Sequence, residues 1–154
     1  IMATNAAPIY GKQYIRYAET WEAAVDTQGG AVGTVEIGEM RCVSYAVYAG
    51  PGVAAAGDAF AAAPTTIVGV NQAYMPPAIA QPYTARQLTV ARSGLLLVET
   101  DPASAVITLN TPLQINLLGQ ATAAGTAVTM DGTTPIVQEN ITIGGRRMAL
   151  VSFA

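Results

Sequence analysis

Histidine, the side chain most often used for acid–base catalysis, is absent from this sequence. Its absence excludes Ser-His-Asp and Cys-His catalysis and the usual zinc sites. The single cysteine, Cys42, lies in an apolar stretch with Arg41 as its only basic neighbour, so burial should raise the thiol pKa rather than leave a reactive thiolate. Neither a GxxxxGK[ST] loop nor a strand-coupled GxGxxG loop is present to hold a phosphate. The sequence therefore favours a protein that is not an enzyme and needs no cofactor.

Acidic residues supply the remaining candidates for chemistry. A calcium ion could gather acidic side chains, but none lies in a DxDxDG loop and each sits where a turn favours such a residue; the four are Asp58, Asp101, Asp131 and Glu139. The Asp-Gly-Thr order at residues 131–133 differs from the aspartic-protease loop, in which Thr or Ser precedes Gly, so a plain turn fits better. A glycosidase needs two of the ten acids facing each other across a cleft, and nothing in their spacing indicates such a pair. We expect no metal site and no catalytic pair.

Other side chains are suited to contacts between proteins. Arg146 and Arg147 follow a Gly-Gly turn and could meet an acidic partner, although arginines at a hairpin tip are usually solvated, which is the interpretation we favour. Residues 10–25 hold three of the seven tyrosines and the only tryptophan. Such rings anchor interfaces, although ordinary core packing explains them equally well. The predicted interface residues are Tyr10, Tyr14, Tyr17, Trp21, Leu95, Leu97, Arg146 and Arg147.

The composition indicates a surface with little charge. Charged residues are 11% of the chain, compared with about 25% in an average soluble domain, while 51% are hydrophobic and the mean hydropathy is +0.36. Because monomers rarely expose large apolar patches, we expect self-association, with an alanine-rich monomer as the alternative. The net charge of -3 and the single lysine argue against nucleic acid as a partner. No uncharged stretch reaches the roughly 20 apolar residues of a membrane span, so we expect no membrane partner.

Residues 87–100, with the sequence QLTVARSGLLLVET, are the stretch around which we expect the chain to be organised. Before Gly94, apolar and polar residues alternate as in a half-buried strand. After it, residues 95–98 are all apolar, which requires cover on both faces of the strand. A glycine where the pattern changes indicates a bulge or a bend. We therefore predict that Leu95, Leu97 or both pack in the core or at a subunit interface.

Turn residues divide the rest of the chain into short apolar runs, for example the Asp-Gly turn at residues 131–132 and a two-glycine hairpin turn at residues 144–145. We count about eight to ten short strands, with residues 106–109 and 113–117 among them, at the spacing of roughly 8 to 12 residues that is typical of a sandwich or barrel. The prediction is an all-β fold, a small β-barrel or jelly-roll-like sandwich, over residues 31–154. Residues 1–30 are predicted to form an arm that binds a neighbouring subunit or the surface of a larger protein assembly. Periodicity does not decide between helix and strand for residues 10–25.

Three segments carry a resemblance to a known family. They are IVGV at residues 67–70, TARQLTVARSGLLLVE at residues 84–99 and TPLQINLLGQAT at residues 111–122. This succession of an IGV strand, a glycine-interrupted apolar strand and a hydrophobic strand after a proline turn resembles the structural cement or decoration proteins of tailed-phage heads. The similarity extends over about residues 38–153.

The resemblance implies a small β-barrel or jelly-roll-like protein that binds the major capsid protein on the capsid exterior of a virion. It also implies a homo-oligomer, commonly a trimer, that joins neighbouring capsomers. A tail, spike or head-fibre component of the virion is the alternative, and it would differ in its location on the particle and in an exposed aromatic platform for sugars. An enzyme with an acidic pair is the third class.

Overall fold

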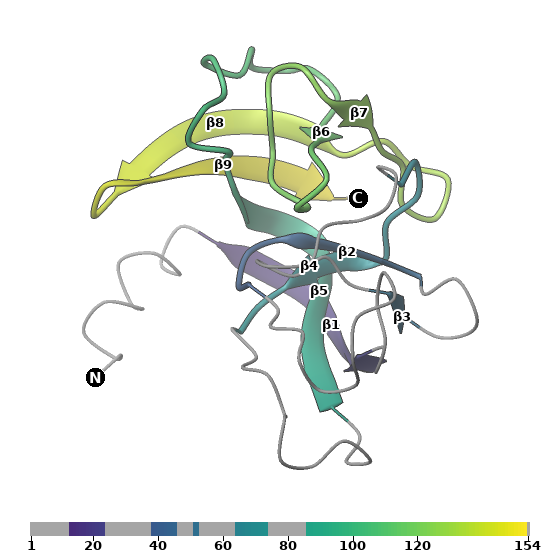
Figure 1. Cartoon of the computed structure of the whole chain (residues 1–154). Coiled ribbons are helices and arrows are strands. Elements are labelled where there is room, and N and C mark those ends of the chain that lie inside the picture. Colours follow the sequence, from purple (N-terminus) through teal and green to yellow (C-terminus); the bar gives the residue numbers. More distant parts are fainter. Residues whose placement is uncertain (1–12, 24–37, 46–50, 53–63, 74–85, 154) are drawn as a thin grey trace.

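The computed structural model describes residues 13–23, 38–45, 51–52, 64–73 and 86–153 (Figure 1). These ranges contain strands and no helix, which confirms the predicted all-β class. They accordingly hold no helix that could span a membrane. The nine strands are β1 (Tyr14–Ala23), β2 (Cys42–Tyr45), β3 (Pro51–Gly52), β4 (Gly69–Asn71), β5 (Arg86–Glu99), β6 (Gln114–Ile115), β7 (Thr126–Ala127), β8 (Ile136–Ile143) and β9 (Arg146–Phe153).

Seven of the strands form one sheet. Its order is β3-β2-β4-β5-β9-β8, with β1 paired to β5, while β6 and β7 form a separate two-stranded sheet. Every strand pair is antiparallel. In Figure 1 the yellow β8–β9 hairpin lies across one end of the teal β5, and the purple β1 runs beside the rest of it. Neither sheet closes on itself within the described ranges, so the predicted barrel or jelly-roll form is not confirmed.

β5 is the strand on which the large sheet is built. β1 pairs with it along residues 86–95, β4 pairs with it at Val90 and Ala91, and β9 pairs with it along residues 94–99. Because a strand has only two edges, β1 must occupy one edge of β5, and β4 and β9 must share the other. The predicted central role of residues 87–100 is confirmed.

Gly94 marks the predicted bend in β5. Its φ angle is +117°, a conformation that residues with a Cβ atom rarely adopt. A Cβ atom here would overlap the carbonyl oxygen of Tyr14 and lie 2.9 Å from the amide nitrogen of Arg16. Opposite this bend, the β1–β5 register shifts on both sides of Tyr17. The bulge prediction is confirmed, and glycine is required because the β1 backbone passes directly over it.

Buried side chains cover both faces of the second half of β5. Leu96 and Val98 point into the main core, and Leu97 points to the opposite face. There it packs in a smaller cluster with Met40, Met148 and Leu150. The predicted cover on both faces is confirmed for residues 96–98, and Leu97 is a core residue. Leu95 is instead partly exposed.

The loop at residues 101–110 corrects one strand prediction. Residues 106–109, predicted as a strand, form none. Side chains of the β8–β9 hairpin, rather than a β-ladder, hold this loop. The Arg147 guanidinium donates to four of its carbonyl oxygens, and Asn140 Nδ2 donates to the Ile107 carbonyl at 2.8 Å. Because these groups satisfy the loop carbonyls, the loop needs no strand partner.

The predicted N-terminal arm is described only at residues 13–23. There the strand alternative is correct, because Tyr14–Ala23 is β1. This part of the predicted arm pairs with β5 of its own chain. Tyr10 and the rest of residues 1–30 lie outside the described residues.

Candidate interaction surface

β1 exposes an apolar patch at the edge of the large sheet. On this strand Tyr14 is 61% exposed, Tyr17 53% and Ile15 41%. Leu95 of β5, directly opposite Tyr14, is 36% exposed. We call Tyr14, Tyr17 and Leu95 the β1 patch, because Ile15 pairs with Gly94 and points to the other face of the sheet. Among the described residues no strand pairs with the second edge of β1, and an unpaired edge beside apolar side chains is suited to a protein partner.

Arg92 ties β1 to other parts of the chain. Its Nε donates to the Val68 carbonyl at 2.9 Å, and its Nη1 and Nη2 donate to Glu19 at 2.9 Å and Asp131 at 2.8 Å. The guanidinium also lies over the Trp21 ring, 5.6 Å from its centroid, within the range of a cation–π interaction. Trp21, a predicted interface residue, is therefore half-buried and packed against its own chain.

Glu19 links the tyrosine and tryptophan side chains of β1. It accepts hydrogen bonds from the Tyr17 hydroxyl at 2.8 Å and from Trp21 Nε1 at 3.0 Å. The bonds from Tyr17, Trp21 and Arg92 hold the pKa of Glu19 below its ordinary value. The same bond to Glu19 raises the pKa of Tyr17. The Glu19 charge beside the β1 patch is thus paired within the chain.

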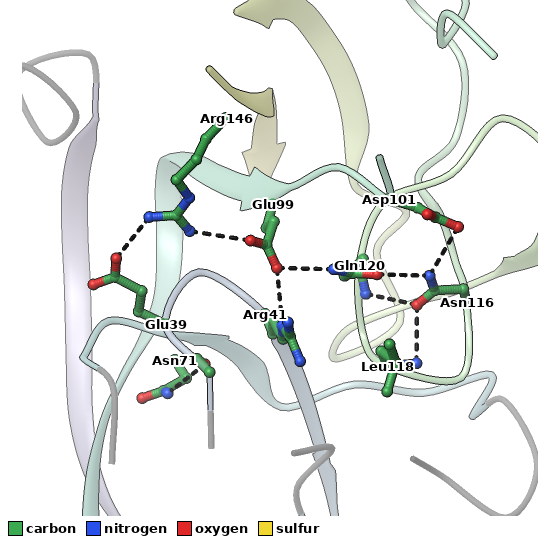
Figure 2. Close-up of polar contacts among 10 residues, drawn as sticks. Glu39, Arg41, Asn71, Glu99, Asp101, Asn116, Leu118, Gln120 and Arg146 are labelled. Atoms are coloured by element: carbon green, nitrogen blue, oxygen red, sulfur yellow. Dashed lines mark hydrogen bonds and ion pairs between the residues drawn. The ribbon is translucent and has the colours of Figure 1, made fainter. Parts of the chain in front are cut away.

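Glu99, at the end of β5, is the centre of a second polar cluster (Figure 2). Its carboxylate accepts hydrogen bonds from Arg41 Nε at 2.9 Å, Gln120 Nε2 at 2.9 Å and Arg146 Nη2 at 3.2 Å. Arg146 Nη1 also donates to Glu39 at 2.7 Å. The cluster therefore joins β5, the start of β2, the β8–β9 hairpin and the loop after β6.

The loop at residues 116–120 presents Gln120 to Glu99. Asn116 Oδ1 accepts hydrogen bonds from the backbone amides of Leu118 at 2.9 Å and Gln120 at 3.0 Å. Its Nδ2 donates to Gln120 Oε1 at 2.9 Å and to Asp101 at 3.3 Å. Figure 2 shows that this arrangement turns the Gln120 amide group toward the Glu99 carboxylate. These contacts fix the loop at residues 116–120 against the end of β5.

The ionisation of Glu99 follows from its partners. Burial opposes the charged form, but the hydrogen bonds from Gln120 and Arg41 and the charges of Arg41 and Arg146 outweigh it, so the pKa of Glu99 is lowered. Burial also opposes the charge on Arg146, and Glu39 and Glu99 outweigh that effect, so its pKa is raised. Both groups stay charged and paired.

The interpretation of Arg146 and Arg147 as solvated tip residues is wrong. Arg146 is held by two carboxylates. Arg147 Nη1 donates to the Ser104 carbonyl at 2.7 Å. Both side chains are partly buried, because the hairpin folds back over the loop at residues 101–110 and the end of β5. They serve the fold of the single chain.

The geometry of the acidic residues does not resemble a catalytic pair. A catalytic pair needs open space for the substrate between its two carboxylates, whereas an arginine that bonds to both carboxylates occupies that space. Two carboxylate pairs of the described chain have such a bridge: Arg146 between Glu39 and Glu99, and Arg92 between Glu19 and Asp131.

Possible metal ligands are dispersed in the described part of the chain, where no three Asp, Glu, Cys or His side chains gather. Asp101, Asp131 and Glu139 thus form no such group, and Asp58 lies outside the described residues. Cys42 is fully buried, and burial raises the pKa of its thiol to about 12. The predicted burial of this thiol is confirmed.

Sequence reasoning selected the exposed Tyr14, Tyr17 and Leu95 but missed Arg92 and Glu99. The sequence did contain a signal for Arg92 and Glu99, because each is a charged residue in or at the end of a largely apolar strand. Such residues are seldom buried unless they are paired. Their partners could not be named, since the bonded residues are up to 73 positions away in sequence. No protein-family model, curated protein or solved structure matches this chain.

Proposed function

We propose that this chain is a non-enzymatic structural protein of a phage virion, which decorates the capsid exterior as a homo-oligomer and stabilises contacts between capsomers. The observation that carries the proposal is the β1 patch, which lies beside a strand edge with which no strand of the described residues pairs. A decoration protein needs surfaces that exclude water and no reaction, and Tyr14, Tyr17 and Leu95 supply such a surface. The capsid part of the proposal is supported by the sequence resemblance.

The use of charge in the fold supports a binding role. Four of the seven basic residues, namely Arg41, Arg92, Arg146 and Arg147, donate hydrogen bonds within the chain. The few charges therefore stabilise the tertiary structure. Interfaces are depleted of charge at their centres and enriched in tyrosine, and the β1 patch has this composition.

Binding to particles tests the proposal. Purified heads of the parent phage that lack this protein should bind the wild-type chain saturably in co-sedimentation. The double variant Tyr17→Ser/Leu95→Ser should lose binding, because it removes two apolar contacts of the β1 patch. Leu117→Ser is the control, since Leu117 is 45% exposed in the loop at residues 116–120, outside the β1 patch, and this variant should bind normally. A wild-type chain that does not bind heads would contradict the capsid function.

A tail, spike or head-fibre component is the second candidate. The exposed rings of Tyr14 and Tyr17 favour it, because aromatic faces of this kind can stack on sugars. Labelling of intact particles with an antibody against the chain separates the two functions. Label on the head supports decoration, and label confined to the tail supports the second candidate.

A further inference from the structure

A pocket lies between the loop at residues 101–110 and the β8–β9 hairpin, and it is formed by different elements from the β1 patch. Its volume is about 130 Å3. A cavity of roughly 150 Å3 is known to take up one benzene molecule. The pocket is therefore of a size to receive a single ring from a partner.

The walls of the pocket are held in place before any ligand arrives. On one side, Arg147 bonds to the carbonyl oxygens of Ser104 at 2.7 Å and Ala105 at 3.3 Å. On the other, Asn140 bonds to the Ile107 carbonyl at 2.8 Å. These bonds fix the loop against the hairpin. A ligand would bind a preformed site and would incur little ordering cost.

The lining combines apolar, polar and cationic groups. Val106, Ile141 and Met148 supply apolar surface, and Val106 is 77% exposed in the single chain. Arg147 supplies a guanidinium, which attracts the face of an aromatic ring. The Thr142 hydroxyl supplies a hydrogen-bonding group. A phenol, with an apolar ring and one polar tip, matches this set.

Thr100 adds a second observation. It also lines the pocket, and its buried hydroxyl oxygen has no hydrogen-bond partner among the described residues. Buried polar groups normally have one. A polar group is thus unused beside the pocket of this single chain.

Tyr14 is the phenol that the chain itself offers. It is the most exposed aromatic ring of the β1 patch, and its hydroxyl makes no hydrogen bond within the described residues. Tyr17 differs, because its hydroxyl is held by Glu19. We propose that the Tyr14 ring of one copy enters the pocket of the next copy.

This inference rests on the self-association in the proposed function and names the contact that produces it. The β1 patch and the pocket are separate surfaces, so the contact is heterologous. Heterologous contacts form a ring when the rotation closes. A closed ring of three copies would agree with the trimer that the resemblance implies.

Sedimentation equilibrium of the free protein tests the contact. Tyr14→Ala should weaken self-association at least about tenfold, the loss expected for an anchoring ring. Leu117→Ala is the control, because Leu117 is an exposed apolar side chain outside both the β1 patch and the pocket, and it should change the association by less than about threefold. Thr142→Trp, which fills the pocket from the exposed side of β8, should weaken association as much as Tyr14→Ala does.

Mixing the two defective variants gives a sharper result. Tyr14→Ala keeps the pocket and Thr142→Trp keeps Tyr14, so the mixture should form a 1:1 dimer at a concentration at which each variant alone is monomeric. A monomeric wild-type chain would overturn the inference. So would an assembly unaffected by both variants, or a mixture that stays monomeric while both variants are folded by circular dichroism.

Titration with p-cresol, the isolated side chain of tyrosine, examines the pocket directly. In the Tyr14→Ala variant it should produce saturable NMR shifts at the amides of Ile141 and Thr142. The absence of saturable shifts would overturn the inference, even if Thr142→Trp fails to fold. Head binding distinguishes this failure from failure of the function: a chain that decorates heads without filling the pocket keeps the function and loses the contact.

Discussion

Replacing Gly94 with alanine should release one end of β1 from the sheet. A non-glycine residue held in a disfavoured region such as φ +117° costs roughly 1 to 3 kcal/mol. The new Cβ would also overlap the Tyr14 carbonyl, so the β1 backbone must withdraw and lose its pairing at Tyr14 and Ile15. Two backbone hydrogen bonds at about 1 kcal/mol each bring the expected loss to about 3 to 5 kcal/mol. That is a large part of the roughly 5 to 15 kcal/mol by which a domain is stable.

Urea unfolding of Gly94→Ala and Gly145→Ala separates the two contributions. Gly145 has a φ of +83°, and no atom lies within 4 Å of the position that an added methyl group would take, so its substitution adds strain without a collision. Gly94→Ala should therefore be the less stable variant by about 2 kcal/mol. Native-state hydrogen exchange should show lost protection at residues 14–17 and retained protection at residues 18–23. Equal losses of stability in the two variants would refute the close approach of β1 to Gly94.

Three further outcomes follow from the buried groups. Glu99→Gln should cost about 2 to 4 kcal/mol near pH 7, because it leaves Arg41 without its carboxylate partner. The folded-state pKa of Glu99 lies below its ordinary value of 4.5. The contribution of the Glu99 charge to stability is therefore complete above pH 4.5 and is lost as the pH falls through the folded-state pKa. The stability of the variant should accordingly fall less steeply with acid than that of the wild type. Leu97→Asp should cost more than about 4 kcal/mol in urea unfolding, because it buries an unpaired charge. Leu95→Asp, at a partly exposed site, should cost about 1 kcal/mol or less. Similar losses in the two variants would contradict the different burial of the two residues. Cys42, whose pKa is raised to about 12 by burial, should react with a thiol reagent at mildly alkaline pH only after unfolding, and rapid reaction of the native protein would show that it is accessible.

The sequence alone was sufficient for features that depend on local pattern. The apolar run after Gly94 predicted a strand covered on both faces, and Leu96, Leu97 and Val98 are buried there. The glycines at residues 144–145 predicted the β8–β9 hairpin, because two positive φ angles in succession are readily adopted only by such residues. Burial of Cys42 followed from its apolar neighbours. In each case the determining residues lie within one strand or turn.

The tertiary structure decided which side chains meet. Tyr14–Ala23 suited a helix as well as a strand until β5 supplied the partner edge. Leu95 and Leu97 look alike in sequence, but only Leu97 is enclosed, by Met40 and the β9 side chains. Arg146 follows a hairpin turn, where solvent contact was expected, but its side chain bonds to Glu39 and Glu99, which are 107 and 47 positions away. Pairing across such separations depends on the register of several strands at once, and no local pattern of residue types encodes that register.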